Sequence, residues 1–353
     1  WQDATPQWFG PLEALHRYTF AMHTMTRILR HPLREMRYRR QAGMGDVPQH
    51  AVYPSCRDYW IWDAAAEEPL AAIAPWEVRL RTPLLRSACR LGVHAADVLR
   101  GVLRGDASAR NGDTPRLPGS EAVIAVGGTE ALFRQTSQFV RELAPRQVCM
   151  RFYMHEEEAA LQERMAVAQK WVREGYALAA GLVQCRAAVR EPERWAAFCE
   201  RVVAALAPHL EWVMVGHAVD EVKWGVWGFG EYRRMMAPLA AVAGRHPHVV
   251  WAGPSVALPR WYYVAAALRH WPPGLRCGAV AVRLPRDTGR FAADRLRSQI
   301  ERVRTLARVL PPYRFERSVV LTELRASPET FDWLADTLES GLAARVVVEA
   351  DLT

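Results

Sequence analysis

Acidic side chains follow two strongly apolar runs of this sequence, and they are its first candidates for chemistry. Glu323 lies near the end of the run at 318–324 (SVVLTEL), and Asp220 and Glu221 follow the run at 211–216 (EWVMVG). A carboxylate can act as a nucleophile or stabilise developing positive charge, and a protonated carboxyl group can donate a proton. We therefore take Glu323, with Asp220 or Glu221 as its partner, as the candidate catalytic set.

Polar and aromatic residues near the ends of apolar runs are candidates for binding a ligand. Lys223 is one of only two lysines in a chain that otherwise uses arginine, so its place beside Trp224 points to a specific role. An ammonium group there could bind a carboxylated or phosphorylated sugar, and the indole of Trp224 could stack on a sugar ring. The other binding candidates are Arg151, His155, Gln184, Arg186, His217 and Arg283.

The elements that must position these residues alternate regularly from residue 121 onward. Short β-rich runs precede longer amphipathic ones, and the β-rich runs are nearly continuously apolar, as is typical of parallel strands covered by helices. Eight such strands predict a closed barrel or an open doubly wound sheet. The first strand lacks a glycine-rich phosphate turn, which favours the barrel over the doubly wound sheet. The predicted fold is therefore of the α/β class, a TIM-like (β/α)8 barrel. The predicted strands are 122–126, 147–153, 176–183, 211–216, 248–253, 275–282, 318–324 and 344–350.

The residues before the barrel predict a mainly helical, basic extension. Residues 11–41 combine apolar residues with seven arginines, which fits a helix packed on the main domain or one lying on an anionic membrane. Residues 42–76 are loop-like, and residues 79–104 are helical in pattern. No eighth barrel helix follows the last strand, and the helix at 79–104 could cover the place where that helix usually packs. A truncated C-terminus would explain the missing helix equally well. The Gly- and Pro-rich linker at 105–120 divides the chain into an extension, 1–120, and a barrel domain, 121–353.

Composition narrows the classes of partner. The net charge is +8, but arginine so outnumbers lysine that the skew is typical of a GC-rich coding background, and we expect no nucleic-acid partner. The six cysteines show no metal-ligand spacing, so we expect buried thiols, no metal and no cofactor. No 18-residue apolar run occurs. The expected location is cytoplasmic or peripheral to the inner membrane; secretion stays open because the N-terminus, Trp1, could be trimmed.

Two segments resemble clan A glycoside hydrolases. The run 319–326 (VVLTELRA) is similar to the seventh strand of that clan, where an apolar strand ends in Thr-Glu. Residues 212–256 resemble the stretch between strands four and five of family 39-type β-xylosidases and α-iduronidases, with Gly216, Trp224, Glu231-Tyr232 and Gly253-Pro254 in matching order.

The resemblance implies a TIM barrel with Glu323 as the nucleophile of a retaining glycosidase. It also implies an acid/base glutamate where this sequence has Ala218, which removes the expected proton donor. Glycosidases need two carboxyl groups, about 5–5.5 Å apart in retaining enzymes and about 6.5–9.5 Å apart in inverting ones. Asp220 or Glu221 would then have to supply the second group.

Two functional classes follow, together with a structural alternative for each residue. The first is a glycoside hydrolase-like protein that acts on a bacterial polysaccharide or glycoconjugate, and the second is a non-catalytic barrel that binds a saccharide, anionic or neutral, or a protein in envelope glycan assembly. Structurally, Glu323 could be paired with Arg283 or Arg325, and His155 with the acidic residues after it could be the solvated first turn of a helix. His217 could equally be a satisfied polar residue.

Overall fold

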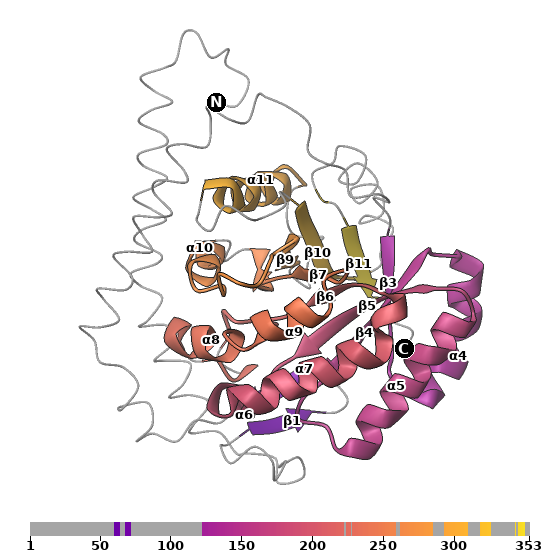
Figure 1. Cartoon of the computed structure of the whole chain (residues 1–353). Helices are drawn as coiled ribbons and strands as arrows, with labels where there is room; N and C mark the ends of the chain where they lie inside the picture. Colours follow the sequence, from indigo (N-terminus) through magenta and orange to yellow (C-terminus); the bar gives the residue numbers. More distant parts are fainter. Residues whose placement is uncertain are drawn as a thin grey trace.

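The computed structural model describes residues 60–63, 68–71, 122–221, 224–226, 228–258, 262–284, 293–309, 318–325, 343 and 345–349. Eight parallel strands form a closed barrel, because β10 pairs with β9 as well as with β11, and β11 pairs with β3. The predicted (β/α)8 barrel is therefore confirmed (Figure 1). Its strands are β3 (Ala122–Val126), β4 (Gln147–Tyr153), β5 (Ala177–Val183), β6 (Leu210–Met214), β7 (Val250–Ala252), β9 (Ala279–Arg283), β10 (Ser318–Arg325) and β11 (Arg345–Glu349).

The barrel is hydrogen-bonded unevenly around its circumference. β4 and β5 share seven residue pairs, whereas β7 and β9 share one, Ala252 with Ala279. A short extra strand, β8 (Val256–Ala257), follows β7 and pairs with the end of β9. The register between β10 and β11 is irregular between Leu321 and Leu324, so the strict alternation of faces is interrupted where Glu323 lies.

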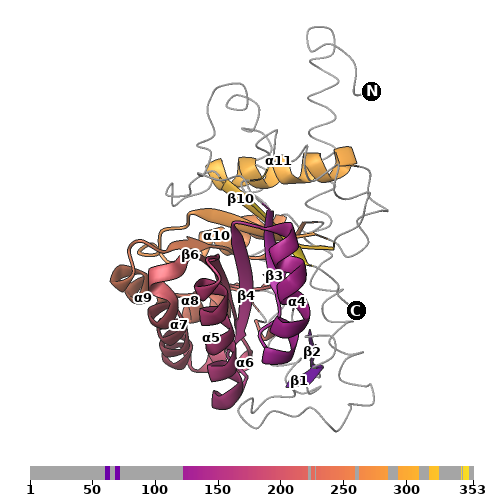
Figure 2. The same ribbon diagram turned by 90° about the vertical axis from the view of Figure 1, so that its right-hand side faces the viewer.

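Helices cover the outside of the barrel, as Figures 1 and 2 show from two directions. Local signals explain several of their ends: the Thr129 side chain accepts the backbone N–H of Leu132 at the first turn, and Pro192 opens another helix, where no donor is needed. The helices are α4 (Glu130–Leu143), α5 (Glu158–Arg173), α6 (Arg186–Arg190), α7 (Pro192–Leu206), the 3-10 turn η1 (Ala207–His209), α8 (Phe229–Met236), α9 (Leu239–Arg245), α10 (Tyr262–Arg269) and α11 (Ala293–Val309).

The amphipathic pattern of residues 230–244 predicts one helix, and the structure divides it in two. The amphipathic run 230–244 forms α8 and α9, which are separated around Pro238. Proline has no backbone N–H and its ring clashes with the preceding turn, so a continuous helix cannot pass through it. The expectation of a single helix was wrong for this reason.

Two apolar layers hold the barrel. The outer one lies between strands and helices and includes the fully buried Phe152, Trp171 and Trp195. The inner one takes one residue from each of the eight strands: Val123, Cys149, Ala179, Trp212, Ala252, Ala279, Val320 and Val347. Trp212 fills much of this inner layer, because three of its neighbours there are alanines.

The described cysteines are buried and free, as expected of small apolar side chains: Cys149, Cys185, Cys199 and Cys277. Burial raises the pKa of the Cys149 thiol to about 12 and that of Cys199 well above its ordinary value. These two thiols are therefore protonated and unreactive at neutral pH.

Part of the N-terminal extension differs from its expected loop character. Residues Trp60–Asp63 (β1) and Glu68–Ala71 (β2) form a two-stranded antiparallel ribbon. The helices expected at 11–41 and 79–104, and the linker at 105–120, lie outside the described residues. No helix of the described part is both long and apolar enough to cross a bilayer.

Candidate functional site

An ion-pair cluster, formed by Asp220, Glu221 and Arg283, lies at the C-terminal end of the barrel. The guanidinium of Arg283, the last residue of β9, donates to Oδ1 of Asp220 at 3.1 Å and to Oε1 of Glu221 at 2.8 Å. The other Asp220 oxygen accepts the backbone N–H of Ala257 at 3.4 Å. The Asp220 side chain is fully buried, whereas that of Glu221 is 23% exposed. Two predicted catalytic residues and one predicted binding residue thus meet in one cluster.

Glu323 belongs to the neighbouring strand at this same end. Thr322 is in register with Arg283, and the backbone N–H of Leu284 donates to the Thr322 carbonyl at 2.9 Å. The Glu323 backbone follows directly in β10, whereas its side chain lies outside the described set. Lys223 also lies outside it. The described backbone therefore places Glu323 on the strand next to Arg283, and Arg283 holds Asp220 and Glu221 of the loop after β6.

Gln184 fixes the start of the loop between β6 and α8. Its side-chain oxygen accepts the backbone N–H of His217 at 3.0 Å, and its amide donates to the carbonyls of His217 and Trp224. Gln184 is fully buried, so these backbone bonds satisfy it inside the protein. The arrangement gives Gln184 a structural role in holding the loop.

The same loop closes part of the barrel mouth with apolar side chains. Ala218 and Trp224 pack on Tyr153 of β4 and Val183 of β5, and all four are buried. Ala218 has a φ of 47°, in the left-handed region, which turns the loop back onto the barrel. The indole of Trp224 meets the His217 ring edge-on at 4.2 Å. Trp224 is 4% exposed, so its indole lacks the open face that sugar stacking requires.

Arg186 is a second anchor of this loop. It makes two hydrogen bonds to the Glu231 carboxylate, at 2.7 and 2.9 Å, and donates to the Gly225 carbonyl at 2.8 Å. Gly225 has a φ of 88°, and a Cβ there would lie 2.6 Å from the backbone nitrogen of Arg186. Only glycine fits this close approach. Sequence reasoning missed Glu231 as the partner, although its charge at the start of α8 was a usable signal.

His155 is buried, so the expectation of a solvated first helical turn was wrong for this residue. Its ring lies 5.5 Å from that of Tyr153, and burial, assisted by the nearby Arg164, lowers its pKa to about 3. Arg164 pairs with Glu156 at 2.7 Å and lies 4.8 Å from the centre of the Tyr153 ring. His155 is therefore neutral at physiological pH, and Arg164 is a neighbour that sequence reasoning missed.

Arg151 of β4 pairs with Glu349 of β11, past the intervening strand β3. Arg151 stands two residues after Cys149 and Glu349 two after Val347, and both of these belong to the inner layer. Since alternate residues of a strand share a face, both charged side chains point into the barrel. The register agrees, because Arg151 is paired with Gly181 and a Cβ at Gly181 would lie 3.3 Å from Arg151 Cγ.

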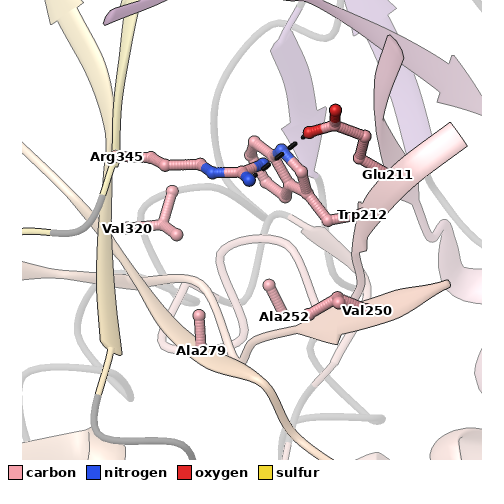
Figure 3. Close-up of a pocket in the computed structure, with 7 residues that line it drawn as sticks. All are labelled: Glu211, Trp212, Val250, Ala252, Ala279, Val320 and Arg345. Carbon is pink, nitrogen blue, oxygen red and sulfur yellow. Dashed lines mark ion pairs between the residues drawn. The ribbon is translucent and has the colours of Figure 1, made fainter. Parts of the chain in front are cut away.

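A small pocket lies at the opposite, N-terminal end of the strands (Figure 3). Its polar edge is the ion pair of Glu211 and Arg345, 3.4 Å apart. Gln147 completes this edge by accepting the indole N–H of Trp212 at 2.7 Å and an Arg345 N–H at 3.1 Å. The remaining walls are apolar: Val250, Ala252, Ala279 and Val320. In barrels of this kind this end contributes stability, while chemistry occurs at the other.

Metal binding has no support in the described residues, where no three His, Cys, Asp or Glu side chains are grouped to hold an ion.

Comparisons with known proteins show no family for this chain. No family model matches the chain, and no curated protein matches it. Among solved structures, the chain is similar to the GH53 catalytic domain of Ignisphaera aggregans, with 11% identity and a TM-score of 0.43, covering 67% of this chain and 87% of that one.

Two further structures show the same level of similarity. The tryptophan synthase A-subunit of Pyrococcus furiosus has 11% identity, a TM-score of 0.40, and covers 65% of this chain and 87% of its own. The HpcH/HpaI aldolase of Desulfitobacterium hafniense DCB-2 has 11% identity, a TM-score of 0.38, and covers 66% and 88%. Proteins of such different names at such low similarity carry no argument for function.

Proposed function

We propose that this chain is a glycoside hydrolase-like protein that acts on a polysaccharide or glycoconjugate at the C-terminal mouth of its barrel. Glu323 is the nucleophile or charge stabiliser in this proposal. The observation that supports it is the register of Thr322 with Arg283, because Arg283 holds Asp220 and Glu221 beside the strand that carries Glu323. Two carboxyl groups flanking one glycosidic bond are the minimum that the reaction needs.

Glu221 is the better choice for the second carboxyl group. The Asp220 side chain is fully buried, and both its oxygens accept hydrogen bonds, from Arg283 and from the Ala257 N–H. It therefore serves to orient Arg283. Glu221 is 23% exposed, so a substrate and a proton can reach it. We assign the acid/base role to Glu221, where the sequence left both residues open.

A panel of aryl glycosides tests this proposal. The parent is compared with Glu323→Gln and Glu221→Gln, and with Glu193→Gln as a matched control on an exposed helix position. We expect Glu323→Gln to lose at least about 100-fold in kcat/KM and Glu221→Gln to lose most for substrates with poor leaving groups, because these need a proton. Parental rates in Glu323→Gln, with unchanged circular dichroism, would sink the hydrolase assignment.

A second candidate is a barrel that binds a saccharide or a protein without turnover in envelope glycan assembly. The observation in its favour is Ala218, which stands where the resembling enzymes carry their acid/base and is packed with Tyr153, Val183 and Trp224. An alanine in a buried cluster leaves no proton donor at that position. Saccharide binding measured by calorimetry, with no product from any glycoside of the panel, would favour this candidate.

Contact of residues 11–41 with an anionic membrane is a further proposal, compatible with both candidates. It is supported by the seven arginines interleaved with apolar residues in that segment. Flotation with anionic liposomes, comparing the chain with and without residues 1–45, tests it. Equal bound fractions would remove the proposal, and with it the expected location at the inner membrane.

A further inference from the structure

The ion pair of Arg151 and Glu349 is reachable from solvent although it lies inside the barrel. The side chains are 26% and 28% exposed, whereas the inner layer directly below them, including Cys149 and Val347, is 1–3% exposed. Solvent therefore reaches this pair from the C-terminal mouth and not through the floor of the barrel. The pair links β4 and β11, the two strands that flank β3 in the barrel.

Small side chains lie at the level of the pair on several strands. This level carries Ala125 on β3, Gly181 on β5 and Ala281 on β9, together with the larger Met214 on β6, each two residues after a member of the inner layer. Ala125 is only partly buried. The loop residues Ala218 and Trp224 cover Tyr153 and Val183 at the ends of β4 and β5. A partly exposed charge among small side chains is a feature of ligand-binding sites.

The partial exposure of the pair limits its contribution to stability, because solvent screens ion pairs that it can reach. A guanidinium is also the group best suited to bind a planar carboxylate or a phosphate through two parallel hydrogen bonds. Glu349 is the carboxylate that holds Arg151 in the structure.

We propose that Arg151 binds the anionic substituent of a sugar, a carboxylate or a phosphate, and that Glu349 is its exchangeable counter-ion. The ligand displaces Glu349 from the guanidinium, and the sugar body occupies the space beside Ala125. The sugar as ligand rests on the proposed function. The anion site itself is measured by binding and so stands or falls apart from any hydrolysis by Glu323.

Calorimetry with three probes tests the proposal: glucuronate, glucose 6-phosphate and uncharged glucose. The full chain is compared with Arg151→Met, Arg151→Lys and Glu349→Gln, and with the exposed pair of Arg141 and Glu174 (Arg141→Met, Glu174→Gln) as matched controls. We expect at least one anionic probe to bind at least 10-fold more tightly than glucose, and the stronger of the two identifies the substituent. Arg151→Met should weaken that probe at least 10-fold, Arg151→Lys by less, and the controls should not change it.

Glu349→Gln separates a binding site from a structural pair. Removal of the competing carboxylate should tighten the anionic probe severalfold and leave glucose unchanged. Weaker binding in Glu349→Gln, parental binding in Arg151→Met, or equal affinity of all three probes would each overturn the proposal. If Arg151→Met does not fold, Arg151→Lys decides, because it keeps the charge and loses the two-pronged geometry. Loss of turnover in Glu323→Gln with anion binding retained would leave both proposals standing; loss of binding alone would remove this one.

Discussion

Replacing Arg283 by methionine should destabilise the barrel far more than removing a surface arginine. The substitution keeps most of the side-chain volume but leaves Asp220, whose side chain is fully buried, and the mostly buried Glu221 without their guanidinium. Breaking a buried ion pair by deleting one partner costs about 3–5 kcal/mol, because a buried charge remains uncompensated. With a dependence of roughly 2–3 kcal/mol per M urea for a domain of this size, the unfolding midpoint should fall by about 1–2.5 M.

The assay is equilibrium unfolding in urea, followed by tryptophan fluorescence and circular dichroism at pH 7. Arg283→Lys should lose less than half as much, since it retains the charge. Adding Asp220→Asn and Glu221→Gln to Arg283→Met should recover most of the loss, because the stranded charges disappear. Arg141→Met, at a 57% exposed position, is the control and should leave the midpoint nearly unchanged. A shift for Arg283→Met no larger than that of this control would refute the reasoning.

Two further substitutions test other parts of the description. His155 has a folded pKa of about 3, below its ordinary 6.5, so unfolding takes up a proton between these pH values. The free energy of unfolding therefore falls as the pH drops from 6.5 toward 3, by at most about 1.4 kcal/mol per pH unit. His155→Gln should flatten that decline in urea titrations at pH 7, 5 and 4; equal slopes would show that His155 is not the cause. Gly225→Ala should cost at least about 1 kcal/mol, since a Cβ there meets the Arg186 backbone, whereas Gly244→Ala, exposed within α9, should gain about 0.5–1 kcal/mol. Thermal melts of both variants check this, and a stabilising Gly225→Ala would contradict the assigned backbone.

The barrel could be predicted because its signal is local. Each strand is a short, nearly continuous apolar run, and burial on both faces produces that composition independently of the neighbouring strands. The run at 147–153 and β4 have the same bounds, and the run at 318–324 ends one residue before β10 does. The break at Pro238 was also local, and a stricter use of proline would have found it.

The contacts of the candidate site were less accessible from the sequence, because they depend on which strands become neighbours. Arg283 was expected to bind ligand or to pair with Glu323, and it holds Asp220 and Glu221, more than sixty positions away. Arg151 was expected to bind ligand, and Glu349, nearly two hundred residues later, holds it. The closure of the barrel decides both partners. Burial of Trp224 is likewise set by a loop that folds back onto strand ends, which no periodicity encodes.

The unequal number of backbone hydrogen bonds between neighbouring strands determines where the barrel opens most easily. β7 is joined to β9 by the pair Ala252–Ala279, and the short strand β8 adds two pairs with the end of β9. Between β7 and β8, the Ser255 N–H donates to the carbonyl of Gly216, which follows β6. Separating β7 and β8 from β9 breaks fewer backbone hydrogen bonds than separating β4 from β5, which share seven residue pairs. A wider opening would therefore start beside β7, on the side of the ring opposite the pair of Arg151 and Glu349.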